Sequence, residues 1–328
     1  MDKNGQLNFS DDPFLLACNT AYQLIEEGSF SEALGQIDEW LDRDPDYPGL
    51  ADIFRTARFW ENRMKEMEHL DKGKLRADFL MNQWEEFIRY AREKGIEETP
   101  SYRAVMKFVF FSASEHYKIA FMNRQSTVDN FDLLLNLGIC FVTLEEYKHA
   151  IDTLEYARSS YRSSAKLLSL LGESFFHDNE IPKSLVFFRE AFFVDPADID
   201  LGLLKAKPIK ELVRICREKK PGADEREWIP IFGYLEDLFY VKRQINSQAV
   251  EAIKREIYTL EKNYQKMTPE KAQTTNIIPR LINKYLWMLD YFEHQNYDFT
   301  SITEIRNHLI KMDKDLFEDH FMKEKPRP

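Results

Sequence analysis

Residues 131–162, FDLLLNLGICFVTLEEYKHAIDTLEYARSSYR, and residues 165–196, AKLLSLLGESFFHDNEIPKSLVFFREAFFVDP, share one pattern at an offset of 34 residues. Repetition at this period indicates stacked helix pairs, each burying its apolar face against the next. The matched positions are Leu134, Leu137, Gly138, Phe141, Ala150, Leu154 and Ala157 in the first copy and Leu168, Leu171, Gly172, Phe175, Ser184, Phe188 and Ala191 in the second.

Small residues in this pattern predict where helices pack closely. Gly138 and Gly172 would let the two helices of a copy approach one another, and Ala157 and Ala191 would leave room for the next helix. A third, divergent copy covers residues 14–45. That copy has Ala21 at the glycine position, Ala33 at the small position, Ile37 four residues later and Pro45 at its end, and it departs at Thr20 and Trp40.

The pattern L-x-x-L-G-x-x-F followed by a small and then a bulky residue resembles the tetratricopeptide repeat (TPR). Pro196 stands where that family has its terminal proline, whereas Arg162 stands there in the first copy. The resemblance is closest over 131–196 and only architectural over 48–127. It implies an all-α fold, a TPR-type α-solenoid that forms a right-handed superhelix of antiparallel helix pairs over residues 12–200.

Helical periodicity extends along the rest of the chain. In the repeat region we expect helices at 13–27, 30–43, 48–69, 73–94, 101–123, 128–143, 147–161, 164–177 and 181–194. A basic linker at 201–224 would lead to a C-terminal helical bundle over 225–318, with helices at 225–244, 247–267, 272–294 and 301–317. Residues 1–11 and 319–328 are expected to be a flexible and a polar tail.

Two apolar seams with heptad spacing predict how the C-terminal bundle packs. An antiparallel hairpin of the two helices that carry them is the simplest arrangement. The seams consist of Val250, Ile253, Ile257, Leu260, Tyr264 and Met267, and of Ile278, Ile282, Tyr285, Leu289 and Phe292.

Composition excludes several classes of function. The chain has 328 residues, 44% of them apolar, only 11 glycines and a formal net charge of -11. It contains no G-x-G-x-x-G and no P-loop motif, which argues against dinucleotide-binding and P-loop enzymes. Because an acidic protein repels the phosphate backbone, nucleic-acid binding is not expected.

The cysteines and histidines do not form a cofactor or metal site. Cys18, Cys140 and Cys216 are far apart in the sequence and are interpreted as buried apolar residues in a reducing compartment. The pairs Glu66–His69 and Asp290–His294 lack further ligands, so no metal or other cofactor is predicted. With no signal peptide and no apolar membrane span, we expect a cytoplasmic location.

The TPR resemblance implies a concave groove that binds a partner. Asn136 and Lys166 stand where some TPR domains have two residues of a clamp for a C-terminal carboxylate, but Leu170 stands where that clamp has an arginine. A groove for a helix or an extended peptide is therefore favoured, and the alternative is a surface buried by the chain's own helices. The groove positions are Asp132, Leu135, Asn136, Ile139, Val142 and Thr143, then Lys166, Ser169, Leu170, Glu173, Phe176 and His177.

A basic patch is the second candidate surface. Residues 205–220 carry seven bases and two acids, whereas residues 1–70 carry 15 acids and six bases. The patch predicts docking of an acidic partner or an anionic membrane surface, or weak head-to-tail self-association, and the alternative is a solvated hinge. Its bases are Lys205, Lys207, Lys210, Arg214, Arg217, Lys219 and Lys220.

From these features we expect a non-catalytic adaptor or scaffold that binds a partner protein through the groove. One alternative is a structural subunit of a large bacterial assembly, such as a flagellar motor or secretion apparatus. A small-ligand receptor or an enzyme is a further alternative, although the sequence shows no convergent set of titratable groups.

Overall fold

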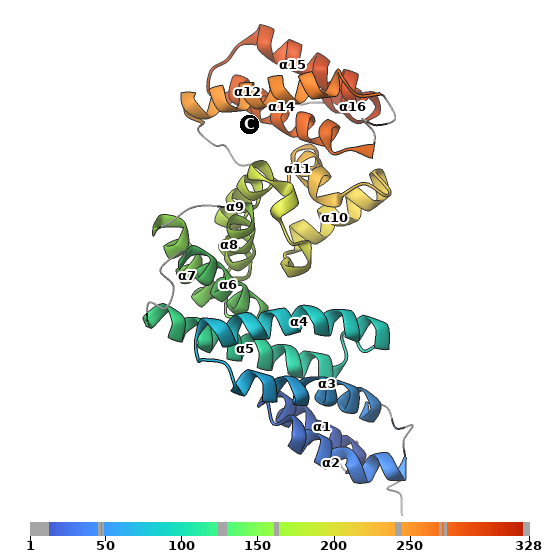
Figure 1. Ribbon diagram of the computed structural model, residues 1–328. Coiled ribbons are helices and arrows are strands. Elements are labelled where there is room, and N and C mark those ends of the chain that lie inside the picture. Colours follow the sequence, from blue (N-terminus) through green and yellow to red (C-terminus); the bar gives the residue numbers. More distant parts are fainter. Residues whose placement is uncertain are drawn as a thin grey trace, which may run out of the picture. The chain divides into compact units, whose positions relative to one another are not determined.

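A computed structural model describes residues 13–44, 47, 49–123, 130–160, 164–239, 245–268, 271 and 274–323. Within these ranges every regular element is a helix, and none of the residues lies in a strand (Figure 1). The all-α class predicted from the sequence is therefore confirmed. The predicted N-terminal tail, Arg162 and half of the polar C-terminal tail lie outside the described residues.

The chain divides into two compact units, Met1–His149 and Ala150–Pro328. The division falls near the start of α7 (Tyr147–Ser160), earlier than the boundary at residue 200 that the repeat pattern suggested. The physical reason is that α9 packs against helices of the C-terminal region.

The first unit contains six helices in the part of the chain that the structure describes. Their ends agree with the predicted ends to within two residues. Local caps mark two of these ends: Thr99 accepts a hydrogen bond from the Tyr102 amide at the start of α5, and Gly95 ends α4 with a φ of 66°. The helices are α1 (Pro13–Glu26), α2 (Phe30–Arg43), α3 (Leu50–Glu68), α4 (Lys74–Lys94), α5 (Pro100–Met122) and α6 (Asn130–Thr143).

Packing in the first unit is not limited to consecutive helices. α1 packs on α2 and α2 on α3, whereas α5 packs on α4 and α6 and also on α1 and α3. At the α1–α5 contact the Phe108 ring lies against Gly28, where a Cβ would be 2.3 Å from Phe108 Cε2. The small residues predicted for the third copy, Ala21 and Ala33, are fully buried.

After most of α7, the second unit continues with a pair of helices, α8 (Ala165–His177) and α9 (Ile181–Val194), that cross closely. A Cβ on Gly172 would lie 2.7 Å from Cδ1 of Phe188, and Ser184 Oγ donates to the Gly172 carbonyl at 2.7 Å. The close approach predicted at Gly172 is therefore confirmed.

After α9 the chain forms two short 3-10 turns and then α-helices. α11 ends nine residues earlier than predicted, because the chain turns at Asp237 (φ 54°) and packs the Phe239 ring on Gly233. The predicted helix 301–317 is two helices that meet at Asp313. These elements are η2 (Pro196–Asp198), η3 (Leu201–Leu203), α10 (Lys207–Lys219), α11 (Glu225–Leu235), α12 (Ser247–Tyr264), α14 (Ile277–His294), α15 (Phe299–Met312) and α16 (Lys314–Lys323).

α14 is the central helix of the second unit. It packs on α11, α12 and α15, and the seam residues Ile282, Tyr285 and Leu289 are buried in these contacts. On α12 the first seam residues are buried, but Tyr264 is exposed. The seam of α14 is thus used inside the unit, and α12 leaves part of one face open next to the end of α9.

Candidate functional site

The α6 half of the predicted groove is tied into the first unit. Ile139 and Val142 are buried, whereas Asp132 is exposed and Leu135 is half-buried. Asn136 Nδ2 donates to the Tyr117 hydroxyl at 3.3 Å, and that hydroxyl donates to Asp78 Oδ1 at 2.9 Å. One of the two donor hydrogens of the Asn136 amide is therefore already engaged within the first unit.

The α8 half of the predicted groove is covered by the chain's own segment 198–206. Glu173 is 1% exposed. Its Oε1 accepts from the Lys205 amide at 2.7 Å and its Oε2 from the Ala206 amide at 3.0 Å, while His177 Nε2 lies 2.9 Å from Oε1.

This carboxylate holds the chain at the start of α10. Ala206 is the N-cap residue of that helix, and Glu173 accepts the backbone amides of Ala206 and of the residue before it. The Lys166 amide likewise donates to Asp198 Oδ2 at 3.2 Å.

Two other groove positions on α8 are inaccessible, and a third is half-buried. Ser169 and Leu170 are about as buried as Glu173, and Phe176 is half-buried against the His177 ring. For α8 the alternative interpretation, a surface covered by the chain itself, therefore describes the structure.

The basic patch is partly neutralised by neighbouring acids. Arg214 pairs with Glu211 and Glu218, and the hydrogen bond from Arg214 lowers the pKa of Glu211. Arg217 pairs with Glu225 at 2.9 Å.

The remaining bases of the patch divide into two groups. Lys220 pairs with Asp313 and lies over the Trp228 ring. Lys205, Lys207, Lys210 and Lys219 have exposed side chains. Since three of the seven bases face acids, the patch has much less free charge than the sequence suggested.

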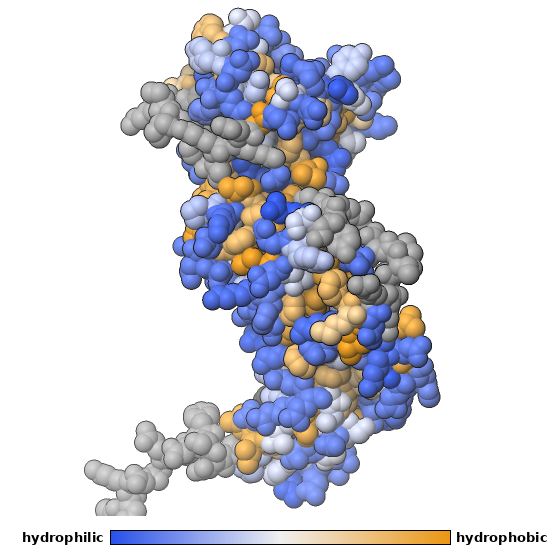
Figure 2. Space-filling model, turned by 90° about the vertical axis from the view of Figure 1, so that its left-hand side faces the viewer, coloured by the Kyte–Doolittle hydropathy of each residue, from blue (hydrophilic) through white to orange (hydrophobic). Residues whose placement is uncertain are grey.

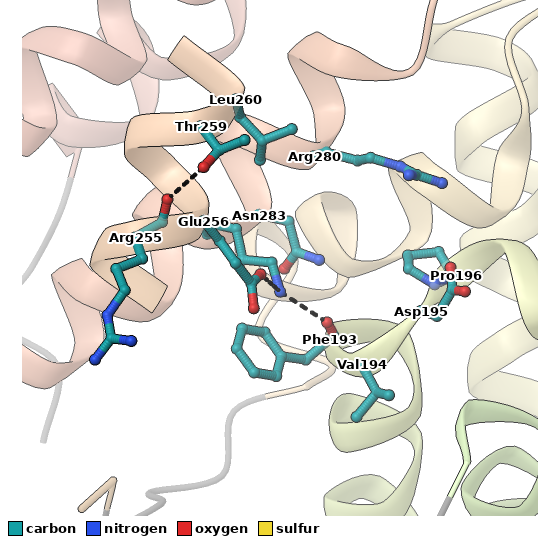
Figure 3. A pocket seen from close by; sticks show the side chains of 11 residues that line it. Phe193, Val194, Asp195, Pro196, Arg255, Glu256, Thr259, Leu260, Arg280 and Asn283 are labelled. Atoms are coloured by element: carbon teal, nitrogen blue, oxygen red, sulfur yellow. Dashed lines mark hydrogen bonds and ion pairs between the residues drawn. The ribbon is translucent and has the colours of Figure 1, made fainter. Parts of the chain in front are cut away.

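A cleft of about 550 Å³ lies between the end of α9, the open face of α12 and α14 (Figure 3). Its size is within the usual range for ligand pockets. It is lined by Phe193, Val194, Asp195, Pro196, Arg255, Glu256, Thr259, Leu260, Arg280, Asn283 and Lys284.

The apolar part of the cleft comes from the last turn of α9 and from α12. The Phe193 ring contacts Trp287, with ring centroids 4.0 Å apart, and Lys284 Nζ lies 3.9 Å from the Phe193 ring centre. Val194 is 50% exposed and Leu260 is half-buried. These side chains form an apolar wall that solvent can reach.

Two side chains of α14 satisfy the carbonyl groups at the end of α9. Asn283 Nδ2 donates to the Phe192 carbonyl at 3.1 Å, and Lys284 Nζ donates to the Phe193 carbonyl at 3.2 Å. A lysine next to a helix C-terminus also offsets the partial negative charge there. The cleft is therefore rigidly framed where α9 meets α14.

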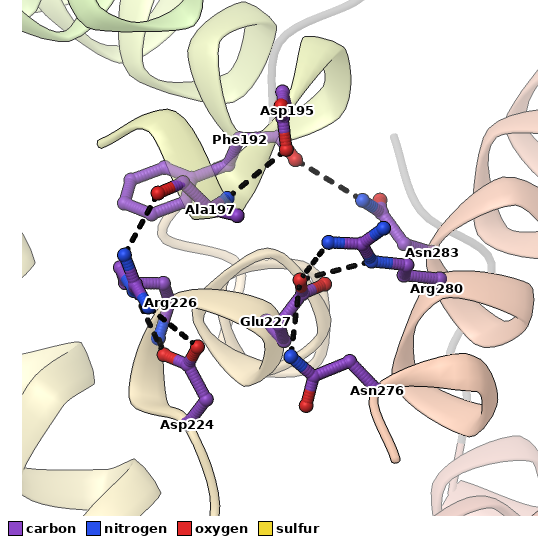
Figure 4. A network of polar contacts seen from close by, with 9 residues as sticks. All are labelled: Phe192, Asp195, Ala197, Asp224, Arg226, Glu227, Asn276, Arg280 and Asn283. Carbon is purple, nitrogen blue, oxygen red and sulfur yellow. Dashed lines mark hydrogen bonds and ion pairs between the residues drawn. The ribbon is translucent and has the colours of Figure 1, made fainter.

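A network of ion pairs and hydrogen bonds joins α11 to α14 and to η2 (Figure 4). Glu227 of α11 is 1% exposed, and its Oε1 accepts from Arg280 Nε at 2.9 Å and from Arg280 Nη2 at 2.6 Å. This pairing raises the pKa of Arg280. Arg226 pairs with Asp224 and donates to the Ala197 carbonyl at 2.7 Å, which ties α11 to η2.

Apolar side chains also reach the surface elsewhere. Figure 2 shows orange apolar groups among the blue polar surface on the face that it displays. Leu16, Phe111 and Phe299 are examples of large exposed apolar residues. They lack the combination of a cavity and converging polar groups found at the cleft, so the cleft is the better candidate site.

Comparisons with family models, with curated proteins and with solved structures found no match for this chain. In the described ranges, no group of three or more histidine, cysteine or acidic side chains could hold a metal ion. Among the helices that the structure describes, none is both long enough and apolar enough to cross a membrane. Cys18, Cys140 and Cys216 are buried, as predicted.

Proposed function

We propose that this chain is a non-catalytic protein-interaction adaptor, and that it binds a segment of a partner protein in the cleft between α9, α12 and α14. The observation that carries the proposal is the cleft itself, which combines an accessible apolar wall with hydrogen-bonding side chains on a rigid helical frame. Such a surface suits an extended peptide, because its apolar side chains and its backbone can both be contacted.

This proposal moves the binding surface away from the groove predicted by the repeat pattern. The α8 part of that groove is filled by residues 198–206, and Asn136 on α6 is held by Tyr117. A partner would have to displace the chain's own segment there, whereas the cleft requires no such displacement. The proposed function is still the one expected from the sequence, protein interaction without catalysis, and only the binding surface differs.

Site-specific photo-crosslinking tests the proposal. A photoreactive amino acid would replace Thr259, which lines the cleft, and in a second variant Lys254, an exposed residue of α12 that does not line it. Both variants would be produced in cells that naturally contain the protein. Crosslinked partners at position 259 that are absent at position 254 are expected, whereas equal crosslinking at both positions, or none at either, would contradict the proposal.

A further inference from the structure

Two arginines bring unused hydrogen-bond donors to the cleft. In Figure 3, Arg255 of α12 and Arg280 of α14 lie on opposite sides of the group formed by Glu256, Asn283 and Phe193. Among the described residues no acid pairs with Arg255. Arg280 gives Nε and Nη2 to Glu227, and no described residue accepts from its Nη1.

The acids that line the cleft are already engaged. Glu256 pairs with Lys284 at 2.8 Å, so these two charges offset one another. Asp195 Oδ1 accepts from the Ala197 amide at 3.1 Å, and the charge of Asp195 acts on Arg280. The cation left without a counterpart in the described cleft is therefore Arg255.

Two side chains of α14 in the cleft suit a peptide backbone. Asn283 donates to the Phe192 carbonyl through Nδ2, which leaves its Oδ1 as an acceptor. Arg280 Nη1 remains as a donor on the same helix. An acceptor and a donor near one another can pair with the amide and the carbonyl of an extended chain, while Phe193 and Leu260 offer an apolar contact for one of its side chains.

The basic patch on α10 does not compete for the same ligand. Arg214 has two acid partners and Arg217 has one, so a carboxylate arriving there must displace an existing ion pair. At Arg255 it meets a guanidinium that no described acid satisfies. A charge-assisted hydrogen bond is worth most where the donor has no other partner.

The geometry points to an acidic peptide as the ligand: an extended segment in which a carboxylate side chain, bound by Arg255, stands next to an apolar side chain that packs on Phe193 and Leu260. This inference rests on the proposed function, because it names the chemistry of the segment that the cleft receives.

Binding of short peptides to the full-length protein tests the inference. The probes are three sets of fluorescent octapeptides, each with a single leucine or phenylalanine, whose flanking positions hold glutamate, glutamine or lysine. We expect the glutamate set to bind about tenfold more tightly than the glutamine set, and the lysine set to bind most weakly. The preference for glutamate should shrink as ionic strength rises from about 0.05 M to about 0.3 M, because the site is open to solvent.

Variants assign the preference to one side chain. Arg255→Ala should weaken the glutamate peptides about tenfold, to the level of the glutamine peptides, and should leave the glutamine peptides unchanged. Arg255→Lys should restore part of the loss. Arg214→Ala is the matched control, an exposed arginine with two acid partners, and should change nothing.

The outcomes separate this inference from the proposed function. Equal binding of the glutamate and glutamine sets would overturn the charge preference but leave the cleft as a peptide site. An equal loss in Arg214→Ala would also overturn the inference, since it would move the acidic ligand to α10. If none of the sets binds, the inference fails, and the absence of crosslinks at position 259 would then remove the proposed function as well.

Discussion

The α8 face and the cleft belong to the same unit but differ in what occupies them. On α8, Glu173 holds two backbone amides of the segment 198–206, and the neighbouring side chains are buried. In the cleft, Val194 is half exposed and Arg255 has no acid partner among the described residues. The first surface has become an internal contact, and the second is open to solvent.

The difference teaches that a repeat pattern locates a concave face without saying what fills it. Glu173 stands at a groove position, yet its carboxylate accepts the two backbone amides that lead into α10. Where buried amides need an acceptor, an acid on that face stabilises the chain's own fold and is no longer available to a partner. Accessibility, rather than position in the repeat, distinguishes the two surfaces.

Replacing one acid on each surface should give the largest contrast in stability. Glu173→Ala leaves two buried amides without an acceptor, so the free energy of unfolding should fall by about 2–4 kcal/mol. Glu256→Ala removes an exposed partner of Lys284 and should cost less than about 1 kcal/mol. Chemical denaturation of both variants measures the difference, and equal losses would mean that the α8 face is not an internal contact.

Substitution of two glycines compares a closely packed helix crossing with an open helix surface. Gly172→Ala places a Cβ against the buried Phe188 ring and should destabilise by about 1–3 kcal/mol. Gly35→Ala, in the middle of α2 with open space around the new Cβ, should stabilise by about 0.5–1 kcal/mol. Thermal melts would show opposite shifts, and a shift in the same direction for both would contradict the close α8–α9 crossing.

A smaller effect is expected from pH at the start of α11. The hydrogen bond from Arg226 lowers the pKa of Asp224. A carboxylate with a lowered pKa adds stability above its unfolded pKa of about 3.9 and loses it as the pH falls through its folded value. Asp224→Asn should therefore lose less stability than the wild type between about pH 5 and pH 3.

This pH effect should be well under 1 kcal/mol, because the Asp224–Arg226 pair is partly open to solvent. Melting temperatures of the two proteins across that range provide the measurement. Parallel curves for the wild type and the variant would show that the pair contributes nothing to acid stability.

Much of the fold could be predicted because helix signals are local. Proline at a first turn, the Thr99 cap and Gly95 define helix ends within a few neighbouring residues, and apolar periodicity supplies the rest. The predicted helix ends are wrong where packing between side chains, rather than a capping signal, determines the end of a helix. α11 ends early because Phe239 folds back on Gly233, which no local pattern indicates.

The cleft could not be predicted for the same reason. Its residues come from three separate stretches, 193–196, 255–260 and 280–284, and none of these stretches carries a motif of its own. Assigning groove positions within one repeat considers only side chains on a single helix. The ion pairs that reduce the free charge of the basic patch could not be predicted either, because Glu225 and Asp313 lie outside the basic segment with which they pair.

Thiol labelling tests most directly the central claim that the cleft is open and the α8 face is filled. Cys18, Cys140 and Cys216 are all buried, and burial raises the pKa of Cys216 to about 12, so the native cysteines should react slowly. One new cysteine would be introduced at Thr259 in the cleft or at Ser169 on α8. The rate of reaction with a maleimide is then measured under native conditions.

We expect Thr259→Cys to react like an exposed thiol and Ser169→Cys to react at least about 100-fold more slowly, because a buried thiol needs the fold to open locally. Acidic octapeptides should slow the reaction at position 259 and leave position 169 unaffected. Similar rates at the two positions, or faster reaction at 169, would contradict the account.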